Sequence, residues 1–231
     1  MLVMPQSIIS ICNMALGHIG RSTLPIVSLT DLSVEARTCG LWYDAARQEC
    51  LELYDWSFCR SRVTLALHND PPPIEWAYRY QVPSGMLAFR DFWNPLANAT
   101  LGGLTSSADG STLYASQGMW NGYYGDLSNA VPYLLEESLD GTELTILTNL
   151  ASAIGIFTKD QVLVQMFSPL FINLLAWTLA AKIAYPITGK MPVAQDAAKQ
   201  AGRAFEIASG SDANQQISEP VRDGYSARAR M

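Results

Sequence analysis

The feature that most constrains the fold is a row of small and apolar residues between positions 32 and 56. Its members recur at alternating spacings of four and three: Leu32, Ala36, Cys39, Tyr43, Ala46, Cys50 and Leu53. This spacing places them on one face of an α-helix, with polar residues turned elsewhere: Glu35, Arg37, Asp44, Arg47, Gln48 and Glu52. The predicted helix is on the order of 35 Å long, roughly the width of a small domain. We expect Leu41 and Trp42 to widen its buried face, and the small residues to let another helix pack closely.

An amphipathic helix is also predicted ahead of this long one. Ser7 can cap it, and the helical pattern ends near Gly20. Its apolar residues are Ile8, Ile11, Cys12, Ala15, Leu16 and Ile19. After a connection at 21–28, Thr30 or Ser33 could cap the long helix, so we expect two antiparallel helices joined by a short loop.

The periodicity changes to that of β-strands after Phe58. Residues 60–67 alternate between polar and apolar, which fits a strand with one buried face. Three prolines at 71–73 end this run. The next alternating run places Arg79 on one face and three aromatic residues on the other: Trp76, Tyr78 and Tyr80. Residues 86–93 could return as a further strand.

A β-hairpin is predicted later in the same region. Residues 133–137 and 143–149 alternate and flank an Asp140, Gly141 turn. Residues 153–158 could extend this hairpin with another strand.

Between these strands lies a segment of different composition. Residues 94–129 are rich in Gly, Ser, Asn and Thr, and we interpret them as an insertion. Its aromatic residues favour an ordered segment that packs on this chain or on another molecule over a flexible linker. Trp120, Tyr123 and Tyr124 are the candidate contact residues.

Two helices are predicted after the β-rich region. Ser168 and Pro169 open a very apolar helix that Pro186 is expected to end. The run from 162 to 184 could be proposed as a membrane span, but polar and proline interruptions favour burial in a bundle. The last helix follows Pro192 and carries these residues on one face: Ala194, Ala197, Ala198, Ala201, Ala204, Phe205 and Ala208. Beyond Gly210 the chain is polar and is expected to have no fold of its own.

The order of elements predicts an α+β fold. Neither helix pair can cover its apolar faces alone, so the two ends of the chain should meet. We therefore expect a mainly α-helical bundle of residues 1–58 and 159–209. A β-rich domain of residues 59–158 is inserted between its second and third helices, and an extended C-terminal arm comprises residues 210–231.

Composition narrows the classes of function. The 231 residues carry a net charge of −6, so the overall field does not favour nucleic acid. The four cysteines form no CxxC pair and only two histidines accompany them, so we expect buried thiols in a reducing compartment and no metal or cofactor. The N-terminal residues show no signal-peptide pattern, which predicts synthesis and use in the cytoplasm.

A set of residues over most of the chain outside 94–129 occurs in the order and spacing of one family. It comprises Ala15, Leu16, Gly17, Glu35, Ala36, Tyr43, Arg47, Glu49, Trp56, Phe58, Trp76, Tyr78, Tyr80, Pro83, Ile146, Leu147, Thr148, Asn149, Phe167, Pro169, Ala176, Leu179, Ala180, Ile183, Pro186 and Thr188. In these residues the chain resembles phage head-to-tail adaptors, which include the tail tubular protein A family of short-tailed phages. The long glycine-rich insertion departs from the shorter members of that family.

The resemblance implies a non-enzymatic structural protein of the virion neck, made in the host cytoplasm. It would form a homo-oligomeric ring, usually a dodecamer, between the portal protein and the tail nozzle protein. DNA would pass through the lumen without sequence-specific binding. In such adaptors the helical bundle and the C-terminal arm commonly dock on the portal, while the β-domain faces the tail.

The arm is the expected portal-binding segment. Its candidate residues are Ile217, Pro220, Val221, Arg222 and Tyr225, and an arm without a binding role is the alternative that the sequence leaves open. For Trp120, Tyr123 and Tyr124 the corresponding hypothesis is a contact with a neighbouring subunit or with the tail.

Two other functions stay open. A tail-associated wall hydrolase would need paired carboxylates, either Glu136 with Glu137 or Asp140 with Glu143. Glu136 and Glu137 are adjacent on a strand and point to opposite faces, and Asp140 is expected to form the turn. A Ser or Cys nucleophile beside His18 or His68 lacks a Gly-x-Ser-x-Gly elbow. A generic intracellular partner-binding bundle would differ from an adaptor only in its partner.

Overall fold

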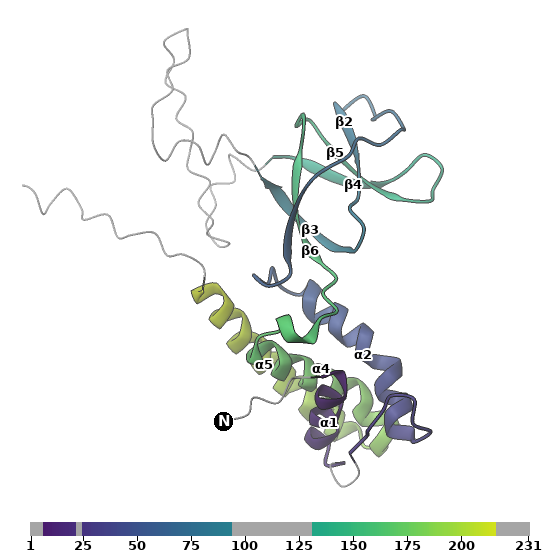
Figure 1. The fold of residues 1–231 in the computed structure, drawn as a ribbon, viewed down its shortest axis with the longest axis vertical. Helices are drawn as coiled ribbons and strands as arrows, with labels where there is room; N and C mark the ends of the chain where they lie inside the picture. Colours follow the sequence, from purple (N-terminus) through teal and green to yellow (C-terminus); the bar gives the residue numbers. More distant parts are fainter. Residues whose placement is uncertain (1–6, 22–24, 94–130, 216–231) are drawn as a thin grey trace, which may run out of the picture. The chain divides into compact units, whose positions relative to one another are not determined.

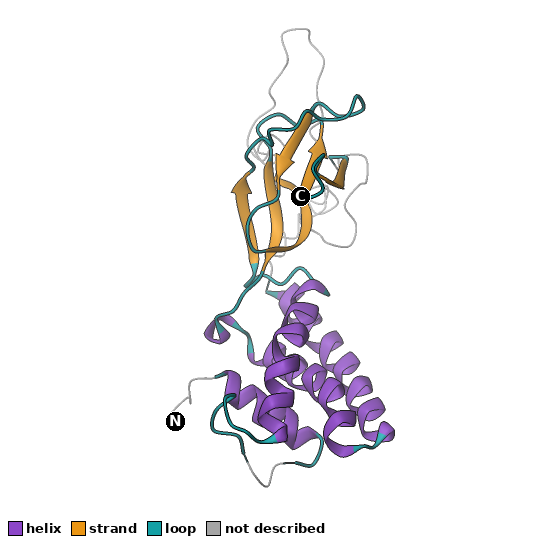
Figure 2. Cartoon of the chain, turned by 90° about the vertical axis from the view of Figure 1, so that its right-hand side faces the viewer, coloured by secondary structure: helices purple, strands orange, loops and turns teal. Residues whose placement is uncertain are grey.

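The computed structural model describes residues 7–21, 25–93 and 131–215. They form two compact units, one from the residues up to Phe58 and from Gln161 onward, the other from Cys59 to Asp160. The first unit is helical and the second consists of strands and loops (Figure 2). The predicted α+β class, with a β-rich part between two helix pairs, is therefore confirmed.

The helical unit is built from four α-helices and one short 3-10 helix among the described residues (Figure 1). These are α1 (Ile8–His18), α2 (Val34–Glu52), η2 (Val164–Met166), α4 (Pro169–Thr188) and α5 (Met191–Asn214). Ser7, Ser33 and Ser168 precede α1, α2 and α4, and each side chain accepts a hydrogen bond from a backbone N–H of the first turn. The caps predicted at Ser7 and Ser168 are thus present, and of the two candidates Thr30 and Ser33 it is Ser33 that caps α2. These side chains satisfy backbone donors that a helix start leaves open.

Helix α4 is the centre of this unit, because α1, α2 and α5 all pack against it. Its buried side chains include Phe171, Leu175 and Leu179. Trp56, which follows α2, lies with its ring centroid 5.1 Å from that of Phe171. The two ends of the chain therefore share one core, as the sequence predicts. By length and composition alone α4 could cross a membrane, but more than half of its most apolar stretch is buried, as in the core helix of a bundle.

Helix α2 is shorter than predicted, and part of its expected buried face is exposed. Leu32 lies before the capping serine and is 90% exposed, and Leu41 is 72% exposed. Cys39 and Tyr43 are buried, so Leu41, about 200° around the helix from either of them, must face away. Arg47, which the helical pattern places outside the stripe, is buried instead.

The two C-terminal helices run further than predicted. Helix α4 continues two residues past Pro186 and ends at Thr188. The next residue, Gly189, caps it with a left-handed φ of 65° and an N–H that donates to Tyr185 O at 2.9 Å. A proline in the last turn removes one hydrogen bond but does not end the helix. Helix α5 continues past Gly210 and buries Asp212, so residues 210–214 belong to the helical unit and not to the predicted arm.

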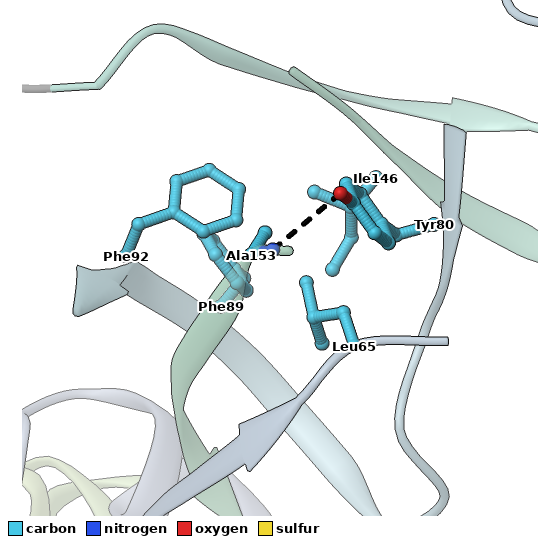
Figure 3. Packing of buried hydrophobic residues seen from close by; sticks show 6 residues of the cluster. All are labelled: Leu65, Tyr80, Phe89, Phe92, Ile146 and Ala153. Atoms are coloured by element: carbon cyan, nitrogen blue, oxygen red, sulfur yellow. Dashed lines mark hydrogen bonds between the residues drawn. The ribbon is translucent and has the colours of Figure 1, made fainter. Parts of the chain in front are cut away.

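Within its described residues, the β unit contains two antiparallel three-stranded sheets. One has the order β1-β6-β3, from β1 (Arg60–Thr64), β6 (Ile154–Lys159) and β3 (Met86–Trp93). The other has the order β2-β5-β4, from β2 (Tyr78–Gln81), β5 (Leu144–Thr148) and β4 (Tyr133–Glu137). Six buried residues from both sheets and their connections form the core in Figure 3: Leu65, Tyr80, Phe89, Phe92, Ile146 and Ala153. The Tyr80 hydroxyl accepts a hydrogen bond from Ala153 N at 3.4 Å.

The predicted hairpin is present as β4 and β5, but β6 does not extend it. Instead, β6 pairs with β1 and β3 in the other sheet. Gly155 explains why β6 fits there: a Cβ at this position would lie 3.0 Å from the Phe89 ring and 3.1 Å from a Leu65 methyl group. Strand β1 also ends earlier than predicted, at Thr64, since Leu67 bridges to Tyr80 of the second sheet.

Candidate functional site

The residues predicted for portal, subunit or tail contact lie outside the described part of the chain. These are Trp120, Tyr123, Tyr124, Ile217, Pro220, Val221, Arg222 and Tyr225. Their roles stay predictions. The candidate site is therefore built from the surfaces of the two described units.

An apolar hollow of about 470 Å³ opens on the helical unit beside the start of α1. Its lining comes from α1, the loop before α2 and the segment around η2: Ser7, Ile8, Ile9, Leu29, Val162, Leu163, Val164 and Gln165. Val162, Leu163 and the neighbouring Met166 are all exposed. Clustered exposed apolar side chains are typical of a surface that binds another protein.

A second hollow, of about 380 Å³, lies between α2, α4 and α5. Small residues of α4 and α5 line it, among them Ala181, Ala198 and Gly202. At its edge the Lys182 ammonium pairs with the Glu49 carboxylate and lies 5.8 Å from the centre of the Trp42 ring. The hollow is thus apolar at its base and balanced in charge at this edge.

Buried polar side chains tie distant parts of the helical unit together. Arg47 on α2 is 3% exposed; its Nη1 donates to Gln161 O at 3.0 Å and its Nη2 lies 3.3 Å from Asp44 Oδ1. Asp212 on α5 accepts from Ser57 N at 3.0 Å and from Ser57 Oγ at 2.6 Å. The periodicity of the sequence did not predict the burial of Arg47 or Asp212, because Gln161 and Ser57 lie more than a hundred positions away from them in the chain.

The β unit carries charged side chains of both signs. Arg60 and Arg62 alternate along β1, and Arg90 on β3 donates through Nε to Thr158 Oγ1 at 2.8 Å. Carboxylates gather at the end of the β4–β5 hairpin: Glu136, Glu137, Asp140 and Glu143. Arg79 on β2 is 1% exposed beneath this hairpin, where its Nη1 donates to Glu137 O and Thr145 Oγ1 and its Nη2 lies 3.8 Å from Glu136 Oε1.

The geometry and hydrogen bonds of the carboxylates considered for a hydrolase do not fit that function. Glu136 and Glu137 are consecutive in β4, so their side chains leave opposite faces of the sheet. Asp140 accepts hydrogen bonds from Ser138 Oγ at 2.6 Å and Thr142 Oγ1 at 2.9 Å, and these bonds lower its pKa. A general acid needs a raised pKa, so this environment does not favour Asp140 as a proton donor.

The histidines and cysteines are packed against or hydrogen-bonded to neighbouring residues and do not form a nucleophilic site. The His18 ring stacks on Trp177 with centroids 3.7 Å apart, and burial lowers the pKa of His18. His68 Nδ1 accepts from Asp70 N at 3.0 Å. The four cysteines are free and buried, and burial raises the pKa of Cys50 to about 12, which makes it a poor nucleophile at neutral pH. Within the described residues, no group of three or more His, Cys, Asp or Glu side chains is placed to hold a metal ion.

Comparison with known proteins adds no family to this description. No protein-family model matches the chain, and no curated protein matches it either. Function is therefore inferred from the residues and from the geometry of the two units.

Proposed function

We propose that this protein is a structural head-to-tail adaptor of a bacteriophage. It forms a homo-oligomeric ring between the portal protein and the tail nozzle protein in the neck of the virion, and DNA passes through its lumen. The proposal starts from the family resemblance, most of whose residues lie on α1, α2, β2, β5 and α4. A dodecamer is the ring size that this resemblance favours.

The observation that carries the proposal is the presence of two units, each with its own core and its own candidate contact surface. The helical unit has the apolar hollow at Val162 and Leu163, and the β unit has the charged β4–β5 hairpin. An adaptor must bind two different partners, and separate units supply separate surfaces for them. Its function needs binding energy, repeated around a ring, and no catalytic group.

The C-terminal segment is the proposed portal-binding part, and it can be removed without cutting α5. Asp212 holds Ser57, so a truncation should retain residues up to Gln215 and remove 216–231. We expect the truncated protein to show the same helical content and unfolding midpoint as the full chain. Its co-sedimentation with portal rings of the same phage should weaken by about tenfold or more, since anchor residues dominate binding energy.

The outcomes separate the arm from the adaptor. Unchanged co-sedimentation of the truncated protein would remove the role of the arm. Failure of the full-length chain to bind portal rings, with or without tail nozzle protein, would overturn the proposed adaptor function. A truncation after Gly210 serves as a comparison, because it also removes Asp212 and should lower stability as well as binding.

A further inference from the structure

Two buried cysteines of the helical unit lie against each other. Cys12 is on α1 and Cys39 is on α2, and both side chains are completely buried. The Cys12 thiol donates a hydrogen bond to the sulfur of Cys39. Tyr43, one turn further along α2, also interacts electrostatically with Cys12. The two thiols therefore face each other where α1 meets α2.

The other cysteine of α2 is too far along the helix to replace Cys12 as the partner of Cys39. Cys39 and Cys50 are both within α2, and their separation along the helix axis is about 16 Å. The Cα atoms of a disulfide are usually about 4.4–6.8 Å apart. The Cys50 thiol is instead hydrogen-bonded to Thr178 on α4, and Cys59 belongs to the β unit.

The packing of α1 allows the two sulfur atoms to come closer. Helices α1 and α2 contact each other over few residues, because each of them packs mainly on α4. Beside Cys12, the Asn13 side chain donates to Ile26 O at 3.0 Å and accepts from Ile26 N at 2.9 Å, which holds the loop before α2 against α1. A small shift of α1 would therefore bring the sulfurs from hydrogen-bond contact to a bond of about 2.05 Å.

We propose that Cys12 and Cys39 form a disulfide that joins α1 to α2 when the protein passes from a reducing to an oxidising compartment. The oxidant is a small-molecule disulfide. The Cys39 thiolate attacks one of its sulfur atoms and releases a first thiolate, which leaves a mixed disulfide on Cys39. The Cys12 sulfur then attacks the Cys39 sulfur and releases a second thiolate. The protein gives up two electrons, and its two thiol protons pass to the two released thiolates.

The surroundings of the pair determine the order of reaction and its effect. The hydrogen bond from Cys12 lowers the pKa of Cys39, so Cys39 is the thiol that reacts first with the oxidant. The bond would restrict the unfolded chain and thereby stabilise the helical unit. It would also hold α1 to α2 directly, in addition to their shared contact with α4. The inference is independent of the proposed adaptor function, because it needs only the helical unit and a change of compartment.

Treatment of the full-length protein with bis(2-hydroxyethyl) disulfide tests the bond. Trypsin cleaves after arginine and lysine, which puts Cys12 and Cys39 on different peptides and Cys50 with Cys59 on a third. After alkylation of the remaining thiols, mass spectrometry should find the first two peptides linked in most molecules and the third peptide alkylated twice. The oxidised protein should unfold at a midpoint at least about 5 °C higher than the reduced protein. Dithiothreitol should reverse both changes.

Alanine variants separate this pair from the other two cysteines. Cys12→Ala and Cys39→Ala should each lose the linked peptides and the rise in midpoint, whereas the matched controls Cys50→Ala and Cys59→Ala should keep both. Each variant is compared with its own reduced form, so that the effect of the substitution on packing cancels. If a variant does not fold, the peptide map of the natural chain decides alone.

Three results would overturn the inference. They are four alkylated cysteines after treatment of the natural chain, a mixed disulfide that persists on Cys39, and a link that involves Cys50 or Cys59. None of them bears on the adaptor, which is tested separately by binding to portal rings. Failure to bind portal rings would in turn leave the disulfide between α1 and α2 unaffected.

Discussion

Single side chains connect parts of the helical unit that lie far apart in sequence. Arg47 binds the backbone carbonyl of Gln161, where the chain re-enters this unit, and Asp212 binds Ser57, where the chain leaves it. A buried charged group is stable only when hydrogen bonds replace its lost hydration. Loss of either side chain would remove the hydrogen bonds that join these two parts of the helical unit.

His18 makes the stability of the helical unit depend on pH. Its Nε2 is buried without a hydrogen-bond partner among the described residues, and burial lowers its pKa below the ordinary value of 6.5. The unfolded chain therefore binds a proton more readily than the folded one. The stabilisation is present above about pH 6.5 and is lost as the pH falls below that value.

Urea unfolding at several pH values between about 7.5 and 5 measures this effect. The free energy of unfolding should decrease toward low pH in the natural chain and decrease less steeply in His18→Phe, which keeps a ring against Trp177. Equal slopes would show that His18 is not responsible.

Local pattern predicts some residues of this structure and misses others for a physical reason. The serine caps were predictable because a cap and its donors lie within three residues of each other. The helical pattern places Arg47 outside the buried stripe, and the strand pattern places Arg79 on the face opposite the aromatic residues; neither pattern predicts burial, since charged residues are seldom buried. Their burial depends on acceptors such as Gln161 O and Glu137 O, which become neighbours only after folding.

At the scale of elements, the sequence predicts the pairing of strands that are close in the chain but not of strands that are far apart. The β4–β5 hairpin was predictable because its strands are joined by a tight Asp140, Gly141 turn. The partner of β6 was not, because the strand nearest in sequence is β5 and the actual partners are β1 and β3. The predicted end of α4 was two residues too early, because Pro186 lies in the last turn, where a missing N–H has little effect.

Two glycines give opposite predictions for the same substitution. Gly155→Ala places a Cβ against Phe89 and Leu65 and should lower the free energy of unfolding of the β unit by about 1–3 kcal/mol. Gly202→Ala on α5 enters open space and should raise that of the helical unit by about 0.5–1 kcal/mol. Urea unfolding of both variants checks the signs, and destabilisation by Gly202→Ala would contradict the open space found beside this position.

At the scale of the whole molecule, the β unit is an insertion whose two ends meet. Lys159 N donates to Cys59 O at 2.8 Å, so the chain enters and leaves the β unit at adjacent residues. The helical unit has its own core around α4, and the β unit has its own core around Phe89 and Ile146. Each unit therefore has the contacts required to fold by itself.

Removal of the insertion tests this independence. A chain in which a short Gly-Ser linker replaces residues 61–158 should keep the helical circular dichroism of the helical unit and unfold cooperatively. The matched control joins residues 1–58 to the same linker without the C-terminal part, and it should lack cooperative unfolding because α4 is missing. Loss of helical structure in the first variant would show that the helices depend on the sheets.

The central place of α4 also determines the order of events during synthesis on the ribosome. Helices α1 and α2 emerge first, yet the helix that covers them is made about a hundred residues later, which at about 5–20 residues per second is a delay of several seconds. During that delay Cys39, Tyr43 and Leu16 are exposed to water, while the β unit can already collapse. A nascent chain halted before residue 169 should therefore recruit chaperones through its first two helices.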